Sequence, residues 1–361
     1  MLLWRCALLY SAFLALVTLA VPVQQSSPCR ADGTSCLQQP GGNGSSTDSV
    51  AASAGRNETS LKFMEIFGSK YPAGSPLFEE RYQVFLENLQ RYKYLNGFAR
   101  APGEAVYGIN QFSDLSSEEF SRIYLRSYPV MKEDYIVPNY TLSIEDNLPL
   151  QFDWRDKKVV SDVKNQMACG ACWAFSIVDT VESDYAIQQH KLMELSVQQV
   201  IDCSYLDNGC SGGSTASALK WLQQSQTKLV KSSEYPFKAQ TGACHFFPKT
   251  EFGVSIKHYK AYDLSNAEER MMTFLTHYGP LAIIVDALSW QDYLGGVIQH
   301  HCSSGHSNHA VVLVGYDKSG DIPYWIVKNS WGKSWGIDGY VHIKMGSNLC
   351  GVADFVTFPL L

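Results

Sequence analysis

The spacing of apolar side chains predicts a helix early in the chain. Residues 61–126 carry many charged side chains, and between them the apolar residues Tyr82, Phe85, Leu89 and Tyr92 recur at steps of three and four. This spacing places the four side chains on one face of an α-helix, where they can be buried together. We therefore expect an amphipathic helix here.

A strand, a turn and a linker are expected after this helix. Val106 and Tyr107 lead into the sequence Gly-Ile-Asn-Gln-Phe-Ser-Asp at 108–114, which predicts a short strand entering a turn. Residues 128–147 carry Pro129 and Pro138 among scattered polar side chains. This composition is typical of an extended linker that a protease can cut.

From residue 148 onward the pattern becomes compact and aromatic. Trp173, Ile177, Val181 and Tyr185 recur every four residues, which predicts a buried helix from near Cys172 to just before residue 190.

A second helix and several strands complete this part of the chain. Ser196 followed by Gln199 resembles a capping box and predicts a helix that runs toward Cys203. The β-rich segments, most of them separated by turn residues, are Val254–Tyr262, Leu281–Val285, His309–Tyr316, Tyr324–Lys328 and Tyr340–Lys344. A helical half (about 148–252) thus precedes a β-rich half (about 253–361), which is an α+β arrangement, and a cleft between two such halves commonly binds ligands.

The first residues resemble a targeting segment. Arg5 precedes an apolar run over residues 6–20 that ends in Thr18, Leu19 and Ala20, so residues 1–20 are predicted to be a cleaved secretory signal peptide. The run is shorter than the ~20 residues of a spanning helix, which argues against a retained anchor. We expect no membrane span later in the chain.

Residues 21–60 form a tract rich in Ser, Gly, Gln and Thr. It has too few large apolar side chains to offset the entropy of ordering its backbone, so we expect it to be disordered. Sequons at Asn43, Asn57 and Asn139 predict exposed N-glycans if the chain enters the secretory pathway.

Composition excludes two classes of protein. The chain has 361 residues, of which 45% are hydrophobic and 18% charged, so it is too apolar to be disordered and long enough for two domains. The net charge is -6 and neither sign forms a long run, which argues against a nucleic-acid partner.

The cysteine count raises a question about one thiol. Of the ten cysteines, Cys6 lies in the signal peptide and Cys29 and Cys36 lie in the disordered tract. The remaining seven are an odd number, so in an oxidising compartment three pairs would leave one thiol free. Parity alone does not say which thiol that is.

Cys172 stands where a thiol can become a nucleophile. It begins the predicted buried helix, and Gln166 lies six residues earlier. The helix dipole and the unpaired amides at a helix start lower the pKa of a thiol, so we expect Cys172 to favour the thiolate.

A thiol nucleophile needs a base, and His309, oriented by Asn329, can serve as that base. His309 opens one β-rich segment and Asn329 closes the next, and a hairpin turning near Ser319 and Gly320 would place them opposite each other. An Asn carbonyl accepting from the imidazole would fix its tautomer and aim its other nitrogen at Cys172.

Together these residues resemble the papain-like cysteine peptidases. The sequence Cys-Gly-Ala-Cys-Trp at 169–173 matches their signature; His309 lies at the usual distance downstream and Asn329 just beyond it. Further matching motifs are Cys-Ser-Gly-Gly at 210–213, Asn-Ser-Trp-Gly at 329–332 and Trp-Gly at 335–336. The resemblance runs from residue 61 to the C-terminus.

This resemblance implies a fold and a mechanism. The fold has a mainly helical left domain and a β-barrel-like right domain with the active-site cleft between them, preceded by a helical propeptide. Cys172 attacks the peptide carbonyl, His309 shuttles the proton, Asn329 orients His309, and Gln166 with the Cys172 amide holds the oxyanion. The implied disulfides are Cys169–Cys210, Cys203–Cys244 and Cys302–Cys350, which would leave Cys172 free.

The resemblance also gives a role to residues 61–147, here named the front segment. Leu77 and Tyr92 depart from the family's inhibitory propeptide signature. Part of that signature is kept at Arg81, Phe85, Asn88 and Asn96. We expect the front segment to lie in the cleft in the non-productive direction, to loosen in acid through carboxylates such as that of Asp114, and to be cut near Leu148, leaving a mature domain at 148–361.

Substrate-binding residues follow from the same resemblance. The subsite for the second residue upstream of the cut is expected to be shallow and apolar, with Phe355 at its floor, and to prefer small or medium side chains. No inserted loop that could block the cleft lies between Cys210 and Cys244, which favours endopeptidase over exopeptidase activity. The predicted substrate-binding residues are Gly212, Gly213, Ser214, Thr215, Ile284, Ala310, Trp335 and Phe355.

The expected partners are peptide and protein substrates, the chain's own propeptide and cystatin-type inhibitors. We expect a monomer that acts in the lysosome or after secretion, without a cofactor. His300, His301, Cys302 and His306 lack a second ligand cluster at zinc-finger spacing, so we expect no metal site.

Two other functions remain open on sequence alone. The chain could be a catalytically silent binding protein of the same fold, although Gln166, Cys172, His309 and Asn329 are all present. It could also be a thiol oxidoreductase that cycles Cys169 with Cys172, although no strand precedes this motif as it does in thioredoxin-like units.

Overall fold

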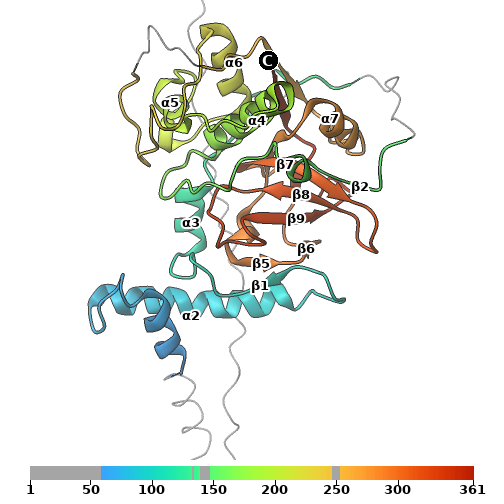
Figure 1. Cartoon of the computed structure of the whole chain (residues 1–361). Coiled ribbons are helices and arrows are strands. Elements are labelled where there is room, and N and C mark those ends of the chain that lie inside the picture. Colours follow the sequence, from blue (N-terminus) through green and yellow to red (C-terminus); the bar gives the residue numbers. More distant parts are fainter. Residues whose placement is uncertain (1–57, 132–133, 139–146, 246–252) are drawn as a thin grey trace, which may run out of the picture. The chain divides into compact units, whose positions relative to one another are not determined.

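A computed structural model describes residues 58–131, 134–138, 147–245 and 253–361 (Figure 1). All of them belong to one compact unit, Gly55–Leu361. The predicted signal peptide, residues 21–57 of the predicted disordered tract, and Asn43, Asn57 and Asn139 lie outside the described residues. Among the described residues, no helix has both the length and the apolar character needed to cross a bilayer.

Helices form where the apolar spacing predicts them and at further places. Residues 58–67 are helical, so 58–60 are not disordered as predicted; this helix buries Phe63 and Phe67 against the next one. The other helices are α2 (Pro76–Asn96), α3 (Ser117–Tyr124), α4 (Cys172–Gln189), α5 (Val197–Cys203), α6 (Thr215–Ser225) and α7 (Arg270–Tyr278). Short 3-10 helices are η2 (Trp154–Lys157), η3 (Gly209–Ser211), η4 (Leu288–Asp292) and η5 (Leu349–Gly351).

The strands form two sheets. A two-stranded sheet pairs β1 (Val106–Tyr107) with β5 (Tyr293–Gly295) and so joins the front segment to the β-rich half. An eight-stranded sheet has the order β3-β10-β4-β7-β8-β9-β6, with β2 paired to β7. Its strands are β2 (Gln151–Asp153), β3 (His258–Tyr262), β4 (Leu281–Val285), β6 (Val297–Ile298), β7 (His309–Asp317), β8 (Tyr324–Lys328), β9 (Tyr340–Lys344) and β10 (Val356–Leu360).

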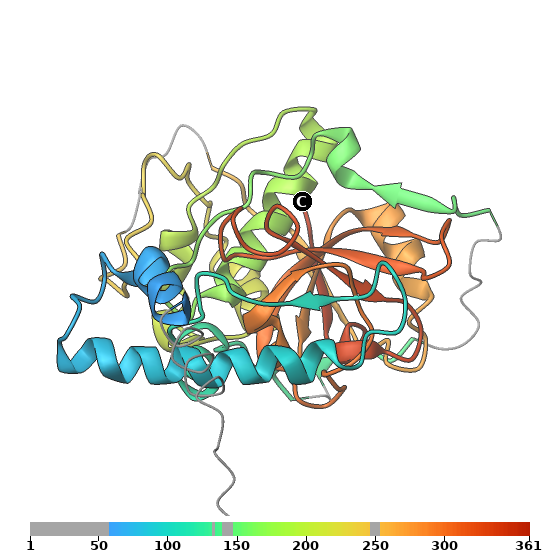
Figure 2. The ribbon, with the colours of Figure 1, turned by 90° about the horizontal axis from the view of Figure 1, so that it is seen from below.

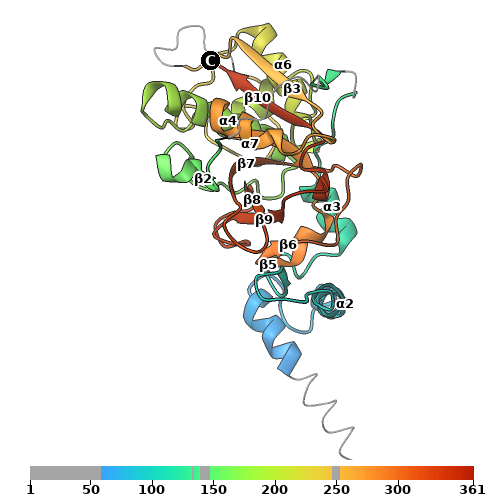
Figure 3. The same cartoon turned by 90° about the vertical axis from the view of Figure 1, so that its right-hand side faces the viewer.

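The two faces of the large sheet serve two cores. Alternate residues of β7 point to opposite faces, so Ala310 joins α4 in one cluster while Val311 and Leu313 join the aromatic core of the β-rich half. Figure 3 shows β3 and β10 side by side next to α6. β2 lies in the predicted helical half, yet it pairs with β7 of the β-rich half. The predicted boundary near residue 252 therefore does not hold for this strand.

The front segment carries a small aromatic core of its own. α2 begins after Ser75, whose hydroxyl accepts from the Phe78 amide, and buries Phe85 and Tyr92 on the predicted face. Phe85 is fully buried, and its ring centroid lies 5.2 Å from that of Phe63. Figure 2 shows α2, the long cyan helix, crossing the end of the β-rich half.

This core predicts a stability effect in the front segment. Phe85→Ala should lower the free energy of unfolding by about 3–5 kcal/mol because it leaves a cavity among packed rings. Leu77→Ala on the same helix should change it by less than about 0.5 kcal/mol, because Leu77 is 47% exposed. Urea unfolding of the precursor at neutral pH, followed by circular dichroism, measures both. Equal effects of the two substitutions would contradict this packing.

Candidate active site

Cys172 occupies the first position of α4, as the sequence predicts. The preceding residue, Ala171, has no side chain that could cap the helix, so the amides of the first turn face the thiol region. Cys172 is the one free cysteine among the described residues, and it is fully buried. The Ala310 amide, one residue beyond His309, lies close enough to the sulfur to lower its pKa.

His309 and Asn329 meet across the β7–β8 hairpin, which confirms their predicted juxtaposition. The His309 Nε2 atom lies 2.8 Å from Asn329 Oδ1. The Ser330 amide also donates to that oxygen, at 2.8 Å, so the oxygen is an acceptor and His309 Nε2 carries the hydrogen. Nδ1 then keeps a lone pair and has no partner within the described part of the chain. The Trp331 ring covers this contact, with its centroid 4.6 Å from that of His309.

A buried cluster of charges ties Asn329 to α4. Lys328, which directly precedes Asn329, is 1% exposed, and its Nζ atom lies 2.7 Å from Asp179 Oδ2 on α4. Lys164 contacts both Asp179 and Glu182, at 2.5 and 2.7 Å. The two cations and two anions balance, so the helix that carries Cys172 and the strand that leads to Asn329 are held in one charged network.

Burial keeps the thiol and the imidazole neutral in this form of the protein. Burial raises the pKa of the Cys172 thiol, although nearby backbone amides lower it in part. Burial likewise lowers the pKa of His309 from 6.5 to about 4, against the opposing effect of Asn329. The predicted thiolate is therefore wrong for the covered state, because desolvation outweighs the helix start.

The Gln166 side chain points its amide at a carbonyl of the front segment. Its Nε2 atom donates to Cys169 O at 2.9 Å and to Tyr124 O at 3.4 Å. Its Oε1 atom accepts from the Ser330 hydroxyl at 2.7 Å, which fixes the orientation of the amide. The same Tyr124 carbonyl lies near the His309 ring, where it opposes the effect of burial on the histidine pKa.

Beyond Tyr124 the front segment crosses the cleft as an extended strand. Ser127 pairs in parallel with Gly213; the Gly213 amide donates to Arg126 O and the Tyr128 amide to Gly213 O, each at 3.1 Å. On the opposite wall the Ser127 amide donates to Asn308 O at 3.0 Å. A chain running the other way would pair antiparallel with Gly213.

Two glycines allow this close approach. Gly212 has φ +122°, and a Cβ there would lie 2.4 Å from Arg126 O. A Cβ on Gly213 would lie 2.6 Å from the Trp173 ring. Any larger residue would therefore push the strand off this wall or disturb α4.

The predicted second-residue subsite comes together beside this strand. Ser214, Thr215, Ile284, Ala310 and Phe355 are all buried, and the last three belong to one apolar cluster with α4. The structure thus brings together residues from α6, β4, β7 and the turn before β10.

The predicted substrate contact of Trp335 gains no support from the geometry. Its ring is fully buried beneath Trp331, 4.8 Å away, and its Nε1 atom donates to Trp290 O. Trp331 instead meets the rings of Phe112 and Phe120 in the front segment, at 5.4 and 5.2 Å. Trp331 thus packs between the His309 ring and the aromatic side chains of the front segment.

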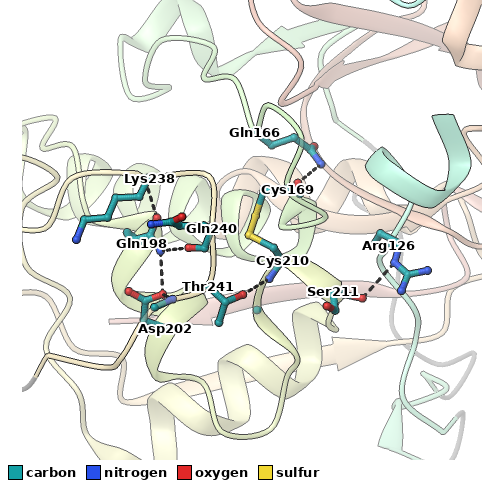
Figure 4. Close-up of a disulfide and its surroundings, with 12 residues drawn as sticks. Arg126, Gln166, Cys169, Gln198, Asp202, Cys210, Ser211, Lys238, Gln240 and Thr241 are labelled. Carbon is teal, nitrogen blue, oxygen red and sulfur yellow. Dashed lines mark hydrogen bonds between the residues drawn. A yellow bond between two sulfur atoms is a disulfide. The ribbon is translucent and has the colours of Figure 1, made fainter. Parts of the chain in front are cut away.

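The three expected disulfides are present. They are Cys169–Cys210, Cys203–Cys244 and Cys302–Cys350. Figure 4 shows the first beside Gln166 and beside Arg126, whose Nε atom donates to Ser211 O at 3.1 Å. Because Cys169 is bonded to Cys210, it is not available as a redox partner for Cys172.

Two contacts anchor α2 to the β-rich half. Arg91 forms a two-pronged ion pair with Asp292 of η4, at 2.5 and 2.8 Å, and the Asp292 side chain is 1% exposed. His301 lies 3.2 Å from the Leu95 carbonyl through Nε2, and its ring stands at 4.5 Å from that of Phe98. Within the described residues no cluster of His, Cys, Asp and Glu could hold a metal ion. His301 contacts Tyr94 and Leu95 of α2, and the His300 ring lies near Phe98, just beyond that helix.

Comparison with known proteins agrees with this geometry. Residues 148–360 match the papain family cysteine proteases, and residues 61–120 match the cathepsin propeptide inhibitor domain (I29). The chain belongs to the papain family of cysteine proteases, with its inhibitory propeptide in the front segment.

Among individual proteins, the chain is 59% identical to cathepsin O of Homo sapiens over 77% of this chain and 87% of that protein. It is 54% identical to cathepsin O of Mus musculus, over 75% of this chain and 86% of that protein. The solved procathepsin L2 proteinase of Tenebrio molitor larval midgut is similar, with TM-score 0.74, 29% identity and coverage of 84% and 100%. The solved structure of a recombinant stem bromelain precursor is also similar, with a TM-score of 0.72 and 32% sequence identity. The match covers 84% of this chain and 99% of that chain.

The buried histidines predict that acid loosens the front segment. While the front segment is docked, His309 resists protonation. Its contribution to the free energy of docking is therefore fully present above the ordinary histidine pKa of 6.5 and is lost as the pH falls toward about 4. Burial lowers the pKa of His301 in the same direction. Asp292 has the opposite effect. Burial raises the pKa of its carboxyl group, so the docked form binds a proton there more readily than the released form.

A single substitution tests this pH dependence. In a full-length Cys172→Ala precursor, release exposes Trp331 and should shift tryptophan fluorescence to longer wavelength. His301→Gln keeps a donor for the Leu95 carbonyl but does not titrate, so the midpoint of acid release should fall to a lower pH. His306→Gln, an exposed histidine, serves as the control. Release that grows as the pH rises, or identical midpoints for both variants, would refute this origin.

Proposed function

We propose that the chain is the zymogen of a cysteine endopeptidase that works through Cys172, His309 and Asn329. The main support for this proposal is the position of the Tyr124 carbonyl, which accepts a hydrogen bond from Gln166 Nε2 and lies near His309. A peptide carbonyl of the front segment thus occupies the place where a substrate carbonyl would be polarised. Its reversed strand direction keeps the neighbouring peptide bond from being presented productively.

The proposed reaction starts when the front segment leaves and water reaches Cys172 and His309. The Cys172 proton moves to His309 Nδ1, and the thiolate sulfur attacks the substrate carbonyl carbon to form a C–S bond. Gln166 Nε2 and the Cys172 amide hold the oxyanion. Collapse breaks the C–N bond, and His309 donates its proton to the leaving amine.

The acyl-enzyme is then hydrolysed. His309 removes a proton from water, whose oxygen attacks the thioester carbon, and the C–S bond breaks to return the thiol and release the acid. Asn329 accepts from His309 Nε2 throughout, which keeps Nδ1 directed at the sulfur and stabilises the imidazolium.

Maturation near Leu148 fits the contacts on either side. Asn147, Pro149 and Leu150 are exposed, so this stretch is open to a protease. Beyond it, Pro149 O accepts from the Tyr316 hydroxyl and Leu150 O from the Lys318 amide, which hold the new end on the β-rich half. We propose that the mature enzyme acts as a monomer in the lysosome or after secretion and is open to cystatin-type inhibitors.

Kinetics of matched variants test the assignment. Each precursor is cut near Leu148 by an added protease and assayed on fluorogenic peptides. Cys172→Ala should lose all hydrolysis and all labelling by an irreversible thiol-directed peptidase inhibitor. Gln166→Ala should lower kcat about 10²- to 10³-fold, because one oxyanion donor is lost. Gln188→Ala, an exposed glutamine on α4, should match the parent enzyme.

Two outcomes would contradict the proposal. Hydrolysis that survives Cys172→Ala would assign the chemistry to another group. Stoichiometric labelling of Cys172 without hydrolysis of any peptide would favour the binding protein of the same fold.

A further inference from the structure

Asp179 lies on the same face of α4 as Cys172. The two residues stand seven positions apart, which is close to two helical turns, so their side chains leave the helix on the same side, about 10 Å apart along its axis. Asp179 is 6% exposed. Two turns beyond the nucleophile, α4 therefore carries a buried carboxylate on the side that meets β8.

Lys328 connects this carboxylate to Asn329 and His309. Its Nζ atom, at the end of a side chain that is 1% exposed, lies 2.7 Å from Asp179 Oδ2. Asn329 is the next residue in the chain, and its Oδ1 atom lies 2.8 Å from His309 Nε2. A change in the position of Lys328 is therefore passed directly to the side chain that orients the imidazole.

Asp179 contacts both cations of the buried network. Its Oδ1 atom contacts Lys164 Nζ and its Oδ2 atom contacts Lys328 Nζ, whereas Glu182 contacts Lys164 and the Ser161 hydroxyl. Burial raises the pKa of Asp179, but Lys164 and Lys328 outweigh burial and hold that pKa below its ordinary value. The carboxyl group is therefore ionised. Burial lowers the pKa of the Lys328 amine, and Asp179 opposes this effect.

The ion pair between Asp179 and Lys328 joins the two halves of the protein. α4 belongs to the helical half and β8 to the β-rich half, so the two charges come from opposite halves, as Cys172 and His309 do. The distance between the Cys172 sulfur and His309 Nδ1 depends on how closely these halves approach. A displacement of about 1 Å between reacting groups is enough to slow a reaction about a hundredfold.

We propose that Asp179 is a positioning residue of the peptidase. Through Lys328 it holds Asn329, and thereby His309, where the imidazole accepts the proton of Cys172. This inference rests on the proposed peptidase function and adds to it a residue that touches neither the substrate nor the reacting atoms. Its loss should therefore slow the chemical steps and leave substrate binding unchanged.

Matched variants test the role of Asp179. Asp179→Asn keeps the size of the side chain but removes the charge that holds Lys328. After cleavage near Leu148 and titration of active sites, its kcat on fluorogenic peptides should be about 10- to 100-fold below that of the parent, with KM within about twofold.

A second carboxylate on the same helix gives the control. Asp184 is also buried, and it accepts from Gln188 Nε2 and the Leu361 amide, so Asp184→Asn should match the parent. An unchanged kcat in Asp179→Asn, a rise in KM alone, or an equal loss in both variants would overturn the proposal.

A double variant separates positioning from stability. Asp179→Leu with Lys328→Met removes one anion and one cation, so Lys164 and Glu182 still balance each other and apolar side chains replace the pair. The urea midpoint should lie close to that of the parent, whereas kcat should stay as low as in Asp179→Asn. Recovery of kcat together with stability would mean that the ion pair only stabilises the fold, which contradicts the proposal.

The ionisation of Cys172 gives a readout without peptide hydrolysis. In the mature enzyme an imidazolium at the right distance keeps the thiolate ionised in acid, so Cys172 should react with dipyridyl disulfide at about pH 5. Asp179→Asn should react at least about tenfold more slowly at that pH, but as fast as the parent above the ordinary thiol pKa of about 8.5. Equal rates in acid would refute the positioning role.

Failure of the proposed function would look different. In that case the parent hydrolyses no peptide, whereas failure of this inference leaves the parent active and Asp179→Asn equally active. The reaction with dipyridyl disulfide decides the role of Asp179 in either case.

Discussion

The exclusion of water from Cys172 and His309 is the interaction on which the rest of the structure depends. The extended segment from Leu125 to Tyr128, which follows α3, covers both groups and bonds to Gly213 on one wall and to Asn308 on the other. Because both charged forms lose hydration there, the thiol and the imidazole stay neutral. The segment that blocks access to the cleft therefore also keeps the thiol and the imidazole neutral.

Several independent contacts hold that strand in place. Phe112 and Phe120 pack on Trp331, β1 extends β5, and Arg91 pairs with the buried Asp292. Because these contacts are spread along the front segment, the covering strand is positioned by a folded unit with its own aromatic core and does not rely on its few hydrogen bonds alone.

The site was largely predictable from the sequence, and parts of the fold were not. Cys172, His309 and Asn329 stand in motifs whose order is distinctive, and α4 repeats a large apolar side chain every four residues. α7 was missed because it interrupts a run of strands, and β10 was missed because Pro359 breaks the strand pattern. The neutral state of Cys172 was unpredictable since it depends on burial by a segment far away in sequence.

The reactivity of one sulfur tests the account most directly. Cys172 can be titrated with dipyridyl disulfide in the intact precursor at neutral pH and again after acid treatment and cleavage near Leu148. Because the front segment covers the thiol, the precursor should react at least about a hundredfold more slowly than the mature enzyme, and mass mapping should place the label on Cys172. Equal rates in the two forms, or recovery of Cys172 in a disulfide, would contradict it.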